Sequence, residues 1–186
     1  MPSLPNAMLE LRTKSAEVAN LEGLNHQGRT IVAWSLAPQE VIERTEGGDT
    51  ASLEDRLAAI KLVQKWGYRV AIKLDPVIPI VSPKKPYLDL IDKLRSVVDV
   101  ENLHHYSVGL LRMGKMLKKI VPELFPESVV NEFELSEKRG GKFTHPEHLR
   151  RQYYSVILTK MKEAFPETPF YISMEEASFA ESVLKD

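Results

Sequence analysis

Three runs of sequence decide the fold of this chain: Met8-Leu-Glu-Leu-Arg-Thr-Lys14, Thr30-Ile-Val-Ala-Trp-Ser-Leu36 and Tyr68-Arg-Val-Ala-Ile-Lys-Leu-Asp-Pro76. Successive side chains of a strand point to opposite faces, so each run presents one mainly apolar face and one face of smaller or polar side chains. On that second face the runs end with Lys14, Ser35 and Asp75. Helical segments separate the runs, which predicts parallel strands, because a tight hairpin cannot return the chain to the same end.

Parallel strands joined by helices predict an α/β fold. If they curl into a barrel, their carboxyl ends open onto one face, where strand-end side chains form the active site. We therefore expect Lys14, Ser35 and Asp75 to converge. Trp34 and Tyr68 are interpreted as aromatic side chains of the core or of the helix-facing side.

The remaining elements are predicted from apolar spacing and boundary residues. Ala16–Leu24 is expected to be a short helix with Val18, Leu21 and Leu24 packed inward. Ser52, with Asp55 three residues later, predicts the start of the longest helix, and Gly67 predicts its end. The other predictions are a helix at Gln39–Arg44 after Pro38, a helix at Tyr87–Val98, a strand at Ser107–Arg112, a helix around Met116–Leu124, an irregular segment at Phe133–His145, a helix at Pro146–Phe165, a strand at Thr168–Ser173 and a helix at Ala177–Asp186.

Composition limits the classes of function. With 186 residues, 43% of them hydrophobic, the chain can bury one core, and a single domain over residues 1–186 is expected. A net charge of -1 gives no overall attraction to nucleic acid or membrane. There is no cysteine, which excludes disulfides, thiolate zinc sites and Cys-ligated iron–sulfur clusters within this chain. No run of about 18 apolar residues and no charged-then-apolar leader is visible, so we expect no membrane association and a cytoplasmic location.

Several motifs together resemble a known family. They are Leu11-Arg-Thr-Lys-Ser15, Ala33-Trp-Ser-Leu-Ala-Pro38, the loop Glu46 to Thr50 with Ser52-Leu-Glu-Asp-Arg56, Gly67-Tyr68, Asp75-Pro-Val-Ile78 and Tyr171-Ile-Ser-Met-Glu175. Their order and spacing are similar to the C-terminal half of the spore photoproduct lyase family, radical S-adenosylmethionine enzymes of DNA repair. The resemblance implies a lyase and a chain that is part of an incomplete parallel (β/α) barrel of radical S-adenosylmethionine type.

The resemblance also implies roles for individual residues. Lys14 matches the lysine that pairs with the methionyl carboxylate of S-adenosylmethionine, Ser35 a cofactor-binding serine, and Asp75 a residue near the adenine or ribose. Glu46 and Arg56 match a pattern that fits either an ion pair or a cofactor role. In the complete protein, the 5′-deoxyadenosyl radical would abstract hydrogen from a DNA photolesion.

The chain also departs from the family. The Cys-x-x-x-Cys-x-x-Cys loop that holds the [4Fe–4S] cluster belongs to an N-terminal half that this sequence lacks, as does the cysteine that donates hydrogen. Ser173 stands where a cysteine is expected, and Phe143 where a tyrosine is common. We therefore expect the chain alone to be inactive and to bind no cluster. It resembles the cofactor- and substrate-binding half of an enzyme, with the N-terminal half as a partner.

A local basic and aromatic segment is the candidate DNA-binding region. Such a patch can hold a nucleic-acid backbone and stack a base, whereas the alternative is a solvated helix face after a loop. Its residues are Lys138, Arg139, Lys142, Arg150, Arg151 and Tyr154, with His145, His148 and Tyr153 among them.

Other interpretations remain open for these residues. Lys14 can pair with Glu10 or Glu17, and Ser35 can cap the helix after Pro38. We predict no metal site at His104-His105, because neighbouring strand residues point to opposite faces, and none at His145 and His148, which lack further ligands.

Two other functions are also considered. A non-catalytic half-barrel would act as a binding or assembly module, since its two open sheet edges need a partner or self-association. A hydrolytic or aldol enzyme would depend on Lys73 and Asp75.

Overall fold

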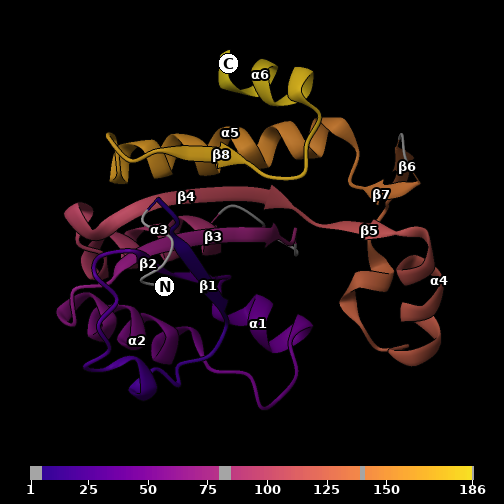
Figure 1. Cartoon of the computed structure of the whole chain (residues 1–186). Helices are drawn as coiled ribbons and strands as arrows, with labels where there is room; N and C mark the ends of the chain where they lie inside the picture. Colours follow the sequence, from indigo (N-terminus) through magenta and orange to yellow (C-terminus); the bar gives the residue numbers. More distant parts are fainter. Residues whose placement is uncertain (1–5, 80–84, 139–140, 186) are drawn as a thin grey trace.

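The protein is described by a computed structural model that covers residues 6–79, 85–138 and 141–185. Its centre is a five-stranded sheet in the order β1-β2-β3-β4-β8 (Figure 1). All neighbouring pairs in this sheet run parallel, which confirms the α/β prediction. The strands are β1 (Leu9–Thr13), β2 (Thr30–Ser35), β3 (Arg69–Val77), β4 (Leu103–Leu110) and β8 (Phe170–Ile172).

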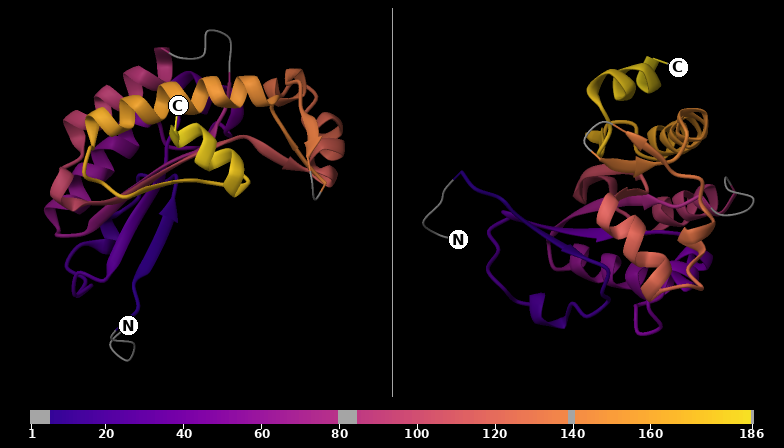
Figure 2. Two further views of the ribbon diagram at one scale, coloured as in Figure 1. Left: turned by 90° about the horizontal axis from the view of Figure 1, so that it is seen from above. Right: turned by 90° about the vertical axis from the view of Figure 1, so that its right-hand side faces the viewer.

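Helices cover one face of this sheet. The core lies between them and the apolar faces of the strands, and it includes Trp34, Ile72 and Tyr106. Figure 2 shows α3 and α5 side by side over the sheet, with α6 packed on α5. The helices are α1 (Gln39–Thr45), α2 (Leu53–Lys65), α3 (Lys85–Val97), α5 (Glu147–Ala164) and α6 (Ala177–Lys185).

The opposite face of the sheet, here called the inner face, has only a small apolar cluster. Ile31, Ala33 and Ala71 form it. Because this cluster is small and includes two alanines, it leaves room for longer polar side chains of the surrounding strands to extend over it. The inner face therefore provides most of the polar groups described below.

The boundary signals of α2 act as predicted. The Ser52 hydroxyl accepts a hydrogen bond from the Asp55 backbone N–H at 3.1 Å and donates one to the Asp55 carboxylate at 2.6 Å. Gly67 follows the helix with a φ of +83°, a conformation that glycine adopts without steric cost. These two signals define the crossover between β2 and β3.

A second sheet lies beyond the carboxyl ends of β3 and β4 (Figure 1). It is antiparallel, in the order β5-β7-β6, and is accompanied by α4 (Lys115–Leu124). The strands are β5 (Arg112–Gly114), β6 (Ser136–Lys138) and β7 (Lys142–Thr144). The segment predicted as the least regular, Phe133–His145, contains β6 and β7, two short strands that the sequence analysis did not predict.

The predicted helix at Ala16–Leu24 was also wrong. Only a 3-10 turn forms, η1 (Ala19–Leu21), and Leu24 is 55% exposed rather than packed inward. The hydroxyl oxygens of Thr13 and Ser15 accept hydrogen bonds from the backbone N–H groups of Ser15 and Glu17, both at 2.9 Å. Such local bonds compete with helical hydrogen bonding. Two further 3-10 turns are η2 (Val100–Asn102) and η3 (Val129–Glu132).

The strand predicted at Ser107–Arg112 begins earlier than expected. β4 starts at Leu103, so His104, His105 and Tyr106 lie within the strand and not before it. No helix in the described part of the chain has the length and apolar character needed to cross a membrane.

Candidate functional site

Lys14, Ser35 and Asp75 line one cavity of about 210 Å³ at the carboxyl ends of β1, β2 and β3. This confirms the convergence expected from strand alternation, although their binding roles remain predictions. The Ser35 side chain does not cap α1, whose start has no side-chain cap. The rest of the lining is mainly apolar and comprises Leu36, Ala37, Val41, Thr45, Glu46, Pro76, Ile78, Leu111 and Val130.

The Lys14 ammonium is held by Glu46, and not by Glu10 or Glu17. Lys14 Nζ donates to Glu46 Oε1 at 2.7 Å, and Arg56 donates to Glu46 Oε2 at 2.5 Å. Arg56 is fully buried and also donates to the backbone oxygens of Ser35 and Ala51, at 3.1 and 3.0 Å. One guanidinium from α2 therefore joins the end of β2 to the carboxylate that orients Lys14.

Glu46 is a carboxylate under two opposing influences. Burial disfavours its charged form, but hydrogen bonds from Arg56 and Lys14 outweigh burial and lower the pKa of the Glu46 carboxyl group. Glu46 therefore stays ionised beside the cavity. With two cations against one carboxylate, the wall next to Lys14 has a surplus positive charge and suits an anionic group.

Asp75 forms the other polar side of the cavity. Its Oδ2 atom accepts a hydrogen bond from the Ser173 hydroxyl at 2.6 Å. The two residues are far apart in sequence and meet because β8 joins the sheet next to β4. The site thus combines a cation, a hydroxyl and an oriented carboxylate around one apolar-walled space.

A separate polar cluster lies on the inner face, centred on Lys73. This lysine is 1% exposed, and its Nζ atom lies 2.6 Å from His105 Nε2, 2.6 Å from the Tyr171 hydroxyl and 3.4 Å from Glu10 Oε1. Burial and the neighbouring Lys73 charge lower the pKa of His105 to about 4. Lys73, on which an aldol mechanism would depend, thus has two hydrogen-bond partners and an ion-pair partner.

The two neighbouring histidines of β4 do not point apart as expected. His104 Nδ1 lies 2.9 Å from His105 Nδ1, because the β3–β4 register shifts between Val70 and Ala71 and leaves one extra residue on β4. Within the described residues, no group of three or more His, Cys, Asp or Glu side chains is placed to hold a metal ion.

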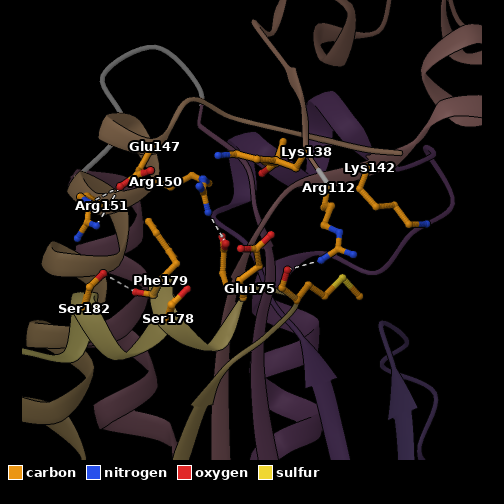
Figure 3. Close-up of a pocket in the computed structure, with 13 residues that line it drawn as sticks. Arg112, Lys138, Lys142, Glu147, Arg150, Arg151, Glu175, Ser178, Phe179 and Ser182 are labelled. Atoms are coloured by element: carbon orange, nitrogen blue, oxygen red, sulfur yellow. Dashed lines mark hydrogen bonds and ion pairs between the residues drawn. The ribbon is translucent and has the colours of Figure 1, made fainter. Parts of the chain in front are cut away.

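The candidate DNA-binding segment lines a larger cavity of about 360 Å³ between β5, β7, α5 and α6 (Figure 3). In Figure 3, Arg112 and Lys142 lie on one side of Glu175, Arg150 and Arg151 lie on the other, and the Lys138 side chain extends above it. Arg112 was not selected from the sequence, and it donates a hydrogen bond to the Met174 backbone oxygen.

The structure corrects the expected surface role of Arg150 and Tyr154. Arg150 is 3% exposed, pairs with Glu175, and lies 4.0 Å from the centre of the Phe179 ring. The Tyr154 hydroxyl donates to Glu175 Oε1 at 3.1 Å. Burial and the Glu175 carboxylate raise the pKa of Tyr154.

Because Tyr153 and Tyr154 are both buried, neither ring can stack on a base in this arrangement. Arg151 forms an ion pair with Glu147 at 2.9 Å, and Arg139 lies outside the described residues. Lys138 and Lys142 on the hairpin are accessible, as is the Arg151 side chain, which is 37% exposed. The Glu175 that holds Arg150 and Tyr154 ends the Tyr171–Glu175 motif, which was the available sequence signal for it.

Comparisons with known proteins agree with this fold. A family model described as "Spore photoproduct lyase" matches residues 1–172. A cysteine-to-alanine mutant of spore photoproduct lyase with dinucleoside spore photoproduct has a TM-score of 0.78 and 22% identity to this chain, over 89% of this chain and 52% of that chain. A double mutant with bound AdoMet (S-adenosylmethionine) and dinucleoside spore photoproduct has a TM-score of 0.75 and 21% identity, over 89% and 51% of the two chains.

This chain thus spans about half the length of the solved structures that it matches. The comparison with curated proteins found no match.

Proposed function

Because this chain belongs to the spore photoproduct lyase family, we propose that it is the S-adenosylmethionine- and substrate-binding half of a spore-photoproduct-lyase-like enzyme. The observation that carries this proposal is the convergence of Lys14, Ser35 and Asp75 on one cavity. Those are the residue types and positions that the family resemblance implies for the cofactor.

The donor set fits the polar groups of S-adenosylmethionine. The Lys14 ammonium suits the methionyl carboxylate, as a point charge held at a strand end by Glu46. The Ser35 hydroxyl can donate to or accept from polar cofactor atoms, and the Asp75 carboxylate can accept from ribose hydroxyls or the adenine amino group. When bound in the complete enzyme, S-adenosylmethionine would supply the 5′-deoxyadenosyl radical for hydrogen abstraction.

The residues of this chain do not fit an iron–sulfur cluster. The sequence has no cysteine, so no thiolate ligand can come from it. We propose that a [4Fe–4S] cluster is held by an N-terminal half, because this chain covers about half of the solved lyase chains. The chain alone is then inactive, and residues 1–186 form a single C-terminal unit of a cytoplasmic enzyme.

A DNA photolesion is the proposed substrate, and the larger cavity near the hairpin is its proposed contact. Lys138, Lys142 and Arg112 provide cations there that suit phosphate oxygens. Solved members of the family carry a dinucleoside spore photoproduct, which supports this substrate class.

Equilibrium dialysis with S-adenosylmethionine tests the cofactor proposal. Wild-type protein should bind the ligand, and Lys14→Ala should weaken binding by about tenfold or more, because a charge-assisted hydrogen bond to the carboxylate is lost. Lys93→Ala is the matched control, since Lys93 is an exposed lysine on α3 whose ion-pair partner, Glu54, lies 3.9 Å away. Absence of binding by the wild type, or equal binding by Lys14→Ala, would contradict the proposal.

A second candidate function is an assembly module without catalysis. The observation that favours it is the open edge of the five-stranded sheet at β1, which pairs only with β2 among the described residues. An unpaired edge strand is a template for association with another chain. Concentration-dependent dimerisation in sedimentation experiments, without S-adenosylmethionine affinity, would support this alternative.

A further inference from the structure

Ser173 replaces the cysteine that the family resemblance predicts, and the structure gives this serine a specific partner. Its hydroxyl donates to Asp75 Oδ2 at 2.6 Å. We propose that Ser173 is a positioning residue that fixes the Asp75 carboxylate for the adenosine part of S-adenosylmethionine. This inference rests on the proposed function and assigns Ser173 a role through Asp75.

Backbone hydrogen bonds between β4 and β8 fix the position of Ser173 next to the cavity. Tyr106, Ser107 and Val108 of β4 pair with Phe170, Tyr171 and Ile172 of β8. The Ser173 N–H then continues this pairing with a hydrogen bond to the Val108 oxygen at 2.8 Å. Ser173 is therefore placed by main-chain bonds next to Gly109, and its side chain reaches over that glycine toward Asp75 on β3.

Gly109 provides the space for this contact. A Cβ atom at this position would lie 2.2 Å from Ser173 Oγ and 3.1 Å from Asp75 Oδ1. The first separation is far below any van der Waals contact, so any other residue would displace the serine hydroxyl. The glycine is required here by close approach, and not by its backbone conformation.

The hydrogen bond determines which carboxylate oxygen is available. An ionised carboxylate only accepts hydrogen bonds, and Oδ2 is engaged by Ser173. Among the described residues, Asp75 Oδ1 has no hydrogen-bond donor, while Asp75 itself lines the cavity. The free oxygen is suited to neutral O–H and N–H donors of a ligand, which are the ribose hydroxyls and the adenine amino group.

The serine also differs chemically from the expected cysteine. A hydroxyl is a better donor than a thiol, and its bond to a carboxylate is short and charge-assisted. Without it, the Asp75 carboxyl group can rotate about its terminal torsion, which is broad in the absence of a partner. Ser173 is thus a functional feature of the adenosine subsite.

Isothermal titration calorimetry of the native protein with three ligands tests this role. The ligands are S-adenosylmethionine, 5′-deoxyadenosine and methionine. Ser173→Ala should weaken the first two by about fivefold to tenfold and leave methionine unchanged, because only the adenosine moiety meets Asp75. The affinities of Ser173→Cys for these two ligands should lie between those of Ser173→Ala and the wild type. Ser96→Ala is the control, since Ser96 is exposed on α3 and its hydroxyl donates to the Lys93 oxygen of the same helix.

A double-mutant cycle shows whether Ser173 acts through Asp75. In an Asp75→Ala background, Ser173→Ala should cause no further loss of S-adenosylmethionine affinity. Gly109→Ala should reproduce the selective loss of adenosine affinity by pushing the hydroxyl away. Thermal unfolding of each variant identifies any variant that fails to fold. If Gly109→Ala fails to fold, the affinities of Ser173→Cys still test the role of the hydroxyl.

The outcomes separate this inference from the proposed function. If the wild type binds S-adenosylmethionine and Ser173→Ala binds it equally well, the inference is wrong and the cofactor role stands. The inference is also wrong if Ser173→Ala loses methionine affinity to the same extent. It is wrong as well if the losses of S-adenosylmethionine affinity in Ser173→Ala and Asp75→Ala are fully additive in the double variant. A wild-type protein with no affinity for S-adenosylmethionine overturns both.

Discussion

His105 is a residue whose protonation the fold opposes. Its imidazole is surrounded by Lys73 at 2.6 Å and Glu10 at 3.3 Å, and burial together with the lysine charge lowers its pKa to about 4. His145 has a pKa lowered to about 4 by burial and by Arg150. Both histidines therefore remain neutral in the folded protein at pH values where an exposed imidazole is charged.

This difference predicts a loss of stability in mild acid. The unfolded chain takes up these protons near the ordinary pKa of 6.5, and the folded chain only near 4. Between these values the unfolded state binds more protons, so the free energy of unfolding falls as the pH is lowered from 6.5 toward 4. Urea unfolding at half-unit pH steps measures the slope.

One variant identifies the source of the slope. His105→Gln should make the slope between pH 6.5 and 5 shallower, because one of the histidines whose pKa burial lowers is removed, while His104 and His145 remain. An unaltered slope in His105→Gln would contradict the assignment. The carboxyl groups of Glu10 and Glu46, whose pKa values are lowered, add their own loss of stability below about pH 4.5.

At the scale of elements, the β6–β7 hairpin is an accessible part of the candidate DNA surface. It carries Lys138 and Lys142 at paired positions, so both ammonium groups belong to one edge of the larger cavity. Arg150, in contrast, belongs to the packing between α5, α6 and the loop before α6. We therefore expect the hairpin lysines to contact DNA, and Arg150 of α5 to stabilise the packing around the cavity.

Removal of the two hairpin lysines tests this division. In the double variant Lys138→Ala and Lys142→Ala, affinity for duplex DNA should fall, and the slope of log affinity against log salt should shrink by about 2, one released counterion per lysine. Fluorescence anisotropy at several salt concentrations gives both values.

The matched control removes Lys61 and Lys65, which are exposed on α2 and away from the cavity. Equal losses of affinity in the two double variants would mean that the binding is a general effect of charge. A reduced affinity with an unchanged salt slope would likewise argue against phosphate contacts by the hairpin.

At the scale of the whole molecule, the inner face and the β1 edge are the features that a further chain segment would cover. In the described part of the chain the helices cover the outer face, and the solved relatives are about twice the length of this chain. We therefore predict that the native protein has a mass well above 21.1 kDa. An in-frame extension upstream of Met1 should carry a Cys-x-x-x-Cys-x-x-Cys motif.

Sequencing upstream of the Met1 codon and intact mass measurement of the native protein check this prediction. A stop codon just upstream together with a native mass of 21.1 kDa would remove the source of cluster ligands. The half-barrel assembly module would then be the better explanation, and the partner of the β1 edge would become the question.

Local patterns in the sequence by themselves determined the strand–helix order and the side of the sheet on which Lys14, Ser35 and Asp75 end. The physical reason is that side-chain alternation in a strand and capping at a helix end depend only on nearby residues. The same patterns failed at the short strands β6 and β7, and at Ala16–Leu24, where side-chain hydrogen bonds replaced a helix.

Only the tertiary structure decided which of these polar groups meet. Ser173 reaches Asp75, and Tyr171 reaches Lys73, across 98 positions of sequence in each case. Both contacts depend on β8 lying next to β4 and on the register between these strands. The alternation of residues within a strand does not specify either one. Arg150 and Tyr154 were likewise expected at the surface, and they are buried because Glu175 and Phe179 pack over them.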